Sequence, residues 1–206
     1  AGIISPQAAL TFVILMAGLF MLTTWFINEL CFFLSPVALA VILGYSLTKR
    51  FTWLCHLILG LGLSLAPIGA FLAVTGEFEL LPLCFSFAVL FWTAGFDIIY
   101  ALQDEEFDRS EKLFSIPVWL GTKKALMLST ILHVFTALFI VAAGMLGNFG
   151  IFYWMGAAAV FLSLLVEQHS IVKHDDLSRV NLAFGTTNGI ASVLFAVFFL
   201  TGYFLR

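Results

Sequence analysis

The fold class is decided by the stretch LLPLCFSFAVLFWTAGFDIIY, residues 80–100, whose one charged side chain is Asp97. A helix needs about 20 mostly apolar residues to cross the hydrocarbon core of a bilayer. The apolar residues here do not alternate with polar ones, as they would in a strand of a membrane barrel, and only helices and closed barrels span lipid. The stretch therefore predicts a transmembrane helix.

Six further apolar stretches of similar length lie along the chain, at about residues 8–27, 30–48, 54–74, 125–146, 151–167 and 183–204. Of the 206 residues, 62% are hydrophobic and only 10% are charged, whereas soluble domains are about 45–50% apolar and about 25% charged. We therefore predict an all-α integral membrane protein, a helical bundle with about seven transmembrane helices that forms one domain over residues 1–206.

Basic residues gather between particular pairs of the predicted helices. Cytoplasmic loops of membrane proteins carry an excess of Lys and Arg. With the N-terminus inside, eight of the nine basic residues fall on the cytoplasmic side, and only Arg206 falls on the other. Two of the cytoplasmic loops are long, at about residues 101–124 and 168–182. We predict a multi-pass protein of the cell (inner) membrane whose long polar loops face the cytoplasm.

Charge and cysteine content exclude two classes of function. The formal net charge is −3 and no basic arm is present, so nucleic acid is not an expected partner. The three cysteines, Cys31, Cys55 and Cys84, lie scattered inside apolar stretches, which fits neither a disulfide framework nor a zinc site. The partner that the composition itself requires is the lipid bilayer.

Acidic residues gather at the end of the stretch at residues 80–100. On a continuous helix Asp97, Asp104 and Asp108 lie within about 40° of one another, and Tyr100 flanks them. Ionisable groups at a membrane boundary are costly and by default mark a functional site. Carboxylates suit Mg²⁺, which is usually held by one or two of them together with substrate phosphates and can stabilise a departing diphosphate. The alternative is a solvated acidic helix end without a ligand.

These four residues reproduce the pattern Asp-x-x-Tyr-x-x-x-Asp-x-x-x-Asp, and in it the sequence resembles the UbiA family of membrane prenyltransferases. Residues 113–117, 121–126 and 167–189 also look like family sequence. The resemblance implies a nine-helix bundle around a lipid-open cavity, where two aspartate-rich motifs hold Mg²⁺ on a polyprenyl diphosphate and an aromatic ring attacks the allylic cation. It implies that Asp104 and Asp108 are metal ligands and that Asp97 and Tyr100 are catalytic.

The sequence departs from the family pattern at the first aspartate-rich motif, Asn-Asp-x-x-Asp-x-x-x-Asp followed by an Arg-Pro segment. None of the four asparagines has an adjacent Asp. Gly2 to Pro6 resembles what normally follows the Arg-Pro segment, and the seven predicted helices would make nine with two more before them. We therefore expect the chain to be the C-terminal part of the nine-helix bundle, N-terminally incomplete and inactive alone.

Six further polar residues have two interpretations each, and two histidines have one. Lys123, Lys124, Lys173 and Arg179 lie in the predicted cytoplasmic loops, where they would bind the diphosphate or serve only as basic anchors of the membrane orientation. Asn181 and Asn188 are seven residues apart on one helix face, where they would line the cavity or bond a neighbouring helix. His56 and His133 lie in apolar helices, and we expect them to be hydrogen-bonded core histidines.

The resemblance implies transfer of a polyprenyl group from a polyprenyl diphosphate to an aromatic acid in quinone biosynthesis. It leaves the acceptor open between 4-hydroxybenzoate and a naphthoate, that is, between the ubiquinone and menaquinone pathways. The alternative from another class is a membrane transporter or divalent-cation carrier that uses Asp97, Asp104 and Asp108 as its ion site. Transporters tend to contain internal repeats, and the two halves of this sequence show no such symmetry.

Overall fold

A computed structural model describes residues 4–205, so Arg206 and residues 1–3 lie outside the described range. Within it, seven helical segments are long and apolar enough to cross a membrane. They are α1 (Pro6–Trp25), α2 (Glu29–Thr48), α3 (Cys55–Thr75), α4 (Leu80–Ala101) continued by η1 (Leu102–Asp104) and α5 (Glu105–Ser110), α7 (Thr122–Leu146), α8 (Ile151–Phe161) continued by η2 (Leu162–Gln168) and α9 (His169–Ile171), and η3 (Leu182–Thr187) continued by α10 (Asn188–Phe204). The prediction of an all-α, multi-pass membrane protein with seven spans is confirmed.

Polar side chains fix where the first helices begin. Ser5 precedes α1, and its Oγ accepts a hydrogen bond from the backbone N–H of Ala8 at 3.2 Å. Asn28 precedes α2, and its Oδ1 accepts from the N–H of Cys31 at 2.8 Å. Such caps satisfy backbone donors that have no partner inside the helix. Asn28 also donates through Nδ2 to the carbonyl oxygen of Leu72 at 2.8 Å, which joins the start of α2 to the end of α3.

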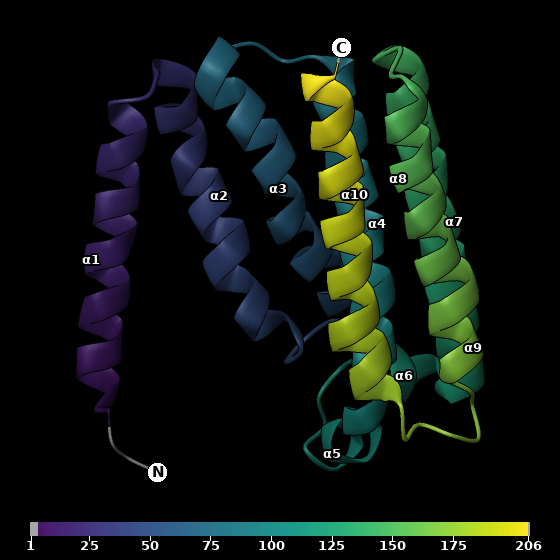
Figure 1. The fold of residues 1–206 in the computed structure, drawn as a ribbon. Helices are drawn as coiled ribbons and strands as arrows, with labels where there is room; N and C mark the ends of the chain where they lie inside the picture. The colour runs from purple at the N-terminus through teal and green to yellow at the C-terminus, as the bar shows by residue number, and fades with distance from the viewer. Residues whose placement is uncertain (1–3, 206) are drawn as a thin grey trace.

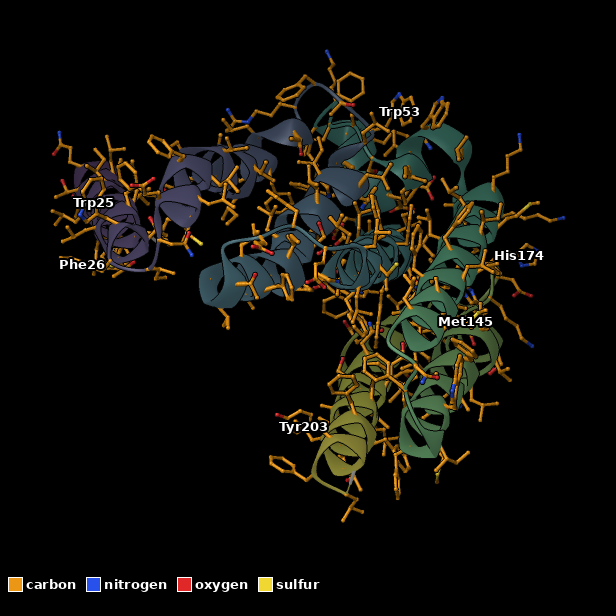
Figure 2. The ribbon with its side chains drawn as sticks, turned by 90° about the horizontal axis from the view of Figure 1, so that it is seen from above. Trp25, Phe26, Trp53, Met145, His174 and Tyr203 are labelled. Atoms are coloured by element: carbon orange, nitrogen blue, oxygen red, sulfur yellow. The ribbon has the colours of Figure 1, made fainter. Side chains whose placement is uncertain are left out.

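The spans stand side by side in the order of the sequence. α1 packs on α2, α2 on α3, α3 on α4, α4 on α7, α7 on α8 and α8 on α10. The row curves back on itself, so that α10 stands in front of α4 (Figure 1). Seen from above, the row is bent, with Trp25 of α1 near one end and Tyr203 of α10 near the other (Figure 2). The helix that leads into the acidic segment, α4, is therefore the middle span.

Two clusters of buried side chains hold the middle of the row together. One contains Ile98 and Ile99 of α4 with Ile116 and Val180 from the connecting segments. The other contains Ala88 of α4 with side chains of α7 and α8, among them Tyr153, whose hydroxyl donates to the carbonyl oxygen of Ile140 at 2.6 Å. Because both clusters include α4, they hold it in place from Ala88 to Ile99.

The predicted loop at residues 101–124 is largely helical. It contains η1 (Leu102–Asp104), α5 (Glu105–Ser110) and α6 (Ile116–Leu120). In Figure 1 these short helices and the segment that joins α9 to η3 lie at the same end of the bundle as the start of α1. Both long polar connections are therefore on one side, as the distribution of basic residues predicts.

Close approach of α3 and α4 requires a glycine at residue 60. A Cβ there would overlap the carbonyl oxygen of Leu90, a backbone atom that cannot turn aside, whereas a Cβ at Gly62 would meet only Val41 Cγ1, at 4.0 Å. We expect Gly60→Ala to lower the free energy of unfolding by about 1–3 kcal/mol, and Gly62→Ala to change it by less than about 0.5 kcal/mol. Unfolding in detergent micelles measures both, and equal losses would show that the contact with Leu90 carries no cost.

Candidate functional site

A pocket of about 200 Å³ lies where α2, α3 and α4 meet, beside the acidic segment. We call it the motif pocket. Carboxylate, ammonium, imidazole and phenol groups share its wall. It is lined by Tyr45, Ser46 and Lys49 from the end of α2, Cys55 and His56 from the start of α3, Asp97, Tyr100 and Ala101 from α4, and Asp104 from η1.

Asp97 is held in this wall by a histidine from the neighbouring helix. Nδ1 of His56 lies 2.7 Å from Oδ2 of Asp97. The His56 side chain is fully buried, and that of Asp97 is 22% exposed. The prediction that His56 is a hydrogen-bonded core histidine is confirmed, and its partner is the first aspartate of the motif.

Asp108 in α5 forms an ion pair with Lys49, the residue that ends α2. Lys49 Nζ donates to both carboxylate oxygens of Asp108, at 2.9 and 3.1 Å. The side chain of Asp108 is only 1% exposed, whereas that of Lys49 is 35% exposed. Burial alone would lower the pKa of Lys49, but its hydrogen bonds to Asp108 and the negative charges of Asp108 and Asp104 outweigh burial and raise the pKa above its usual value.

The three aspartates do not form one continuous stripe, and that expectation is wrong. α4 ends at Ala101, and η1 is a turn of 3-10 helix, in which each residue advances by about 120° instead of 100°. Asp97 and Asp104 therefore line the motif pocket, while Asp108 turns to Lys49. Among the described residues no group of three acidic, His or Cys side chains is arranged to hold a metal ion.

Tyr100 stands beside these carboxylates with its ring accessible. It lines the motif pocket and is 38% exposed. Its ring centroid lies 4.2 Å from that of Phe184, which belongs to η3. The pocket therefore presents an aromatic ring next to Asp97 and Asp104.

The four basic residues predicted to bind a diphosphate do not line the motif pocket. Lys123 and Lys173 line a different, more open pocket of about 420 Å³, together with His169 and His174. Figure 2 shows His174 at the outer edge of the bundle. The other two, Lys124 and Arg179, are exposed. This placement fits their alternative interpretation as basic anchors, and the cation in the motif pocket is Lys49.

Neither asparagine lines the motif pocket. Asn188 connects helices, because its Oδ1 accepts from Trp92 Nε1 at 3.0 Å and from Gln168 Nε2 at 3.3 Å. Asn181 is exposed, and its Oδ1 accepts from Gln103 Nε2 at 3.4 Å. Both asparagines therefore bond neighbouring segments, which is the second of their two interpretations, and do not line the motif pocket.

Lys49 and His56 are the pocket residues whose role the sequence does not reveal. Lys49 precedes Asp108 by 59 residues, and His56 precedes Asp97 by 41. In the sequence Lys49 indicates only membrane orientation, and His56 only a buried polar group. The packing of α2 and α3 against α4 and α5 brings them to the motif.

Comparison with known proteins identifies the family. Residues 1–201 match the UbiA prenyltransferase family. The chain is 34% identical over 149 residues to the 4-hydroxybenzoate octaprenyltransferase of Alcanivorax borkumensis, covering 72% of this chain and 51% of that protein. It is 28% identical over 172 residues to the 4-hydroxybenzoate octaprenyltransferase of Francisella tularensis subsp. mediasiatica, covering 84% of this chain and 60% of that protein.

Solved structures share the fold. The apo structure of a UbiA homologue from Aeropyrum pernix K1 superposes with a TM-score of 0.85 at 27% identity, over 97% of this chain and 74% of that one. A digeranylgeranylglyceryl phosphate synthase has the same fold, with a TM-score of 0.74 at 20% identity, over 98% of this chain and 72% of that one. The chain spans between half and three fifths of the curated relatives' length. On its sequence and its fold, the chain belongs to the UbiA prenyltransferase family.

Proposed function

We propose that the full-length protein transfers a polyprenyl group from a polyprenyl diphosphate to an aromatic acid, 4-hydroxybenzoate or a related naphthoate, in quinone biosynthesis. The observation that carries the proposal is the motif pocket, which gathers Asp97, Asp104, Lys49 and Tyr100 at one end of a membrane-spanning bundle. Two similar proteins are named 4-hydroxybenzoate octaprenyltransferases. We further propose that this end of the bundle faces the cytoplasm of the inner membrane.

The donor set of the motif pocket fits Mg²⁺. This ion needs one or two carboxylates and completes its shell with water and substrate phosphates. Asp104 offers a carboxylate in the pocket wall, and Asp108 adds a second if Lys49 releases it. Bound there, Mg²⁺ would neutralise diphosphate charge and so favour departure of the diphosphate.

The protein's own side chains supply the remaining steps of the proposed reaction. Lys49 places its ammonium ion near the diphosphate, which leaves with the electron pair of the broken carbon–oxygen bond. The face of Tyr100 stabilises the allylic cation through its π-electrons. A ring carbon of the acceptor then bonds the allylic carbon, and the proton that this ring carbon loses passes to the carboxylate of Asp97.

The proposal is tested by assaying the full-length protein in membranes with radiolabelled polyprenyl diphosphate and each acceptor in turn. We expect labelled prenyl product with one of the two aromatic acids. Chelation of divalent cations should stop transfer, and added Mg²⁺ should restore it, because the diphosphate then has a counterion again. Absence of product with both acceptors in the presence of Mg²⁺ would contradict the proposed activity.

A further inference from the structure

The hydrogen bonds of His56 define which of its ring nitrogens carries the proton. Nε2 of His56 lies 3.3 Å from the backbone nitrogen of Ile116, which donates to it. Ile116 is the first residue of α6, so its N–H has no partner inside that helix. A nitrogen that accepts a hydrogen bond carries no proton. With Nε2 engaged by Ile116, Nδ1 is the ring nitrogen that faces Asp97 and donates to it.

This bond engages one oxygen of the Asp97 carboxylate. Oδ2 accepts from His56 at 2.7 Å, while Oδ1 has no hydrogen-bond partner among the described residues. Asp97 itself lines the motif pocket. A donor that is itself held in place fixes the orientation of the carboxylate it bonds. Asp97 is thus held in one orientation, with Oδ1 available to the pocket.

Backbone contacts fix His56 in turn. Its side chain is fully buried. Beside it, Cys55 Sγ lies 3.6 Å from the carbonyl oxygen of Phe114 and donates to it, and the N–H of Phe114 donates to the carbonyl oxygen of Lys49 at 2.7 Å. The segment before α6 is therefore attached to α2 and α3 beside the pocket, which holds the imidazole in one position.

We infer that His56 is a positioning residue for prenyl transfer, which orients the carboxylate of Asp97 to receive the proton of the acceptor. The inference rests on the proposed function, and it assigns a role to a residue outside the aspartate-rich motif. It differs from a purely structural role, in which His56 would serve only to cap α6 by accepting from Ile116.

Two variants of similar shape separate these roles. Both His56→Asn and His56→Leu remove the acceptor for the Ile116 N–H, so they share that structural loss. Only Asn places an N–H donor where Nδ1 stands. We expect His56→Leu to lower kcat roughly tenfold to a hundredfold, the usual loss when a partner that orients a functional group is removed. We expect His56→Asn to retain at least about a third of wild-type kcat, and KM for the polyprenyl diphosphate to change less than about twofold in both.

The measurement uses the full-length protein in membranes, with His133 as the matched control. His133 is equally buried but bonds His169 and does not line the motif pocket, so its Asn and Leu variants should have the same kcat as each other. In an Asp97→Asn background, His56→Leu and His56→Asn should have the same kcat, because no carboxylate remains to be oriented.

The outcomes distinguish failure of the inference from failure of the proposed function. Equal loss in the two His56 variants would overturn the positioning role in favour of the structural one. Full activity in both would show that His56 does not act on the reaction at all. If the wild-type protein transfers no prenyl group to either acceptor, the proposed function fails, and the inference fails with it.

Discussion

Asp104→Ala should abolish most prenyl transfer, with a loss of kcat on the order of 100- to 1000-fold, comparable to removing one group that stabilises developing charge in an active site. Asp104 is the motif carboxylate that lines the pocket without an ion-pair partner among the described residues. It is therefore the carboxylate most available to a divalent ion. The loss is measured as initial rates at saturating polyprenyl diphosphate and Mg²⁺.

Glu106→Ala is the matched control for this variant. Glu106 lies two residues further along the acidic segment, is exposed and does not line the motif pocket. Its removal changes the net charge by the same amount, so a general effect of acidity would affect both variants alike. We expect Glu106→Ala to stay within about twofold of the wild type. A similar loss in both variants, or none in Asp104→Ala, would contradict the assignment.

Lys49→Met should destabilise the protein by roughly 2–4 kcal/mol. Removing one partner of a buried ion pair typically costs about 3–5 kcal/mol because the other charge remains buried and unpaired, and the 35% exposure of the Lys49 side chain reduces that cost. In Lys49→Met the carboxylate of Asp108, whose side chain is only 1% exposed, would lose its cation. Equilibrium unfolding in detergent micelles measures the difference.

Two companion variants test the reason for that loss. Asp108→Asn should be less destabilising than Lys49→Met, since Lys49 is partly exposed and can turn to water whereas Asp108 cannot. Lys123→Met should change stability by less than about 0.5 kcal/mol, because the Lys123 side chain is exposed and has no salt bridge among the described residues. If Asp108→Asn proved the more harmful change, the buried carboxylate would not be the group that needs its partner.

The spans could be predicted from the sequence because hydrocarbon thickness sets helix length directly. The predicted span at residues 30–48 is observed as Glu29–Thr48, and that at 54–74 as Cys55–Thr75. The sixth stretch, at 151–167, is short for a span and could extend to about residue 172 by its sequence, and the observed span ends at Ile171. Its polar residues have partners inside the bundle, with Gln168 donating to the carbonyl oxygen of Ala183 at 2.9 Å.

The site could be predicted only as far as the acidic segment itself. Sequence spacing identified Asp97, Tyr100 and Asp104, which all line the motif pocket. It could not show that a 3-10 turn follows α4, because the angle between Asp97 and Asp108 was calculated for a continuous α-helix. The contacts of Lys49 and His56 depend on how helices far apart in the chain pack, and a single sequence carries no record of that.

The central claim is that the motif pocket binds the diphosphate of a prenyl substrate. The most direct test is a structure of the full-length protein with Mn²⁺ and a prenyl diphosphate analogue that cannot ionise, with the metal located by its anomalous signal. We predict a metal peak beside Asp104 and diphosphate density within reach of Lys49. Metal and diphosphate bound instead between Lys123 and Lys173, with the motif pocket empty, would contradict the account.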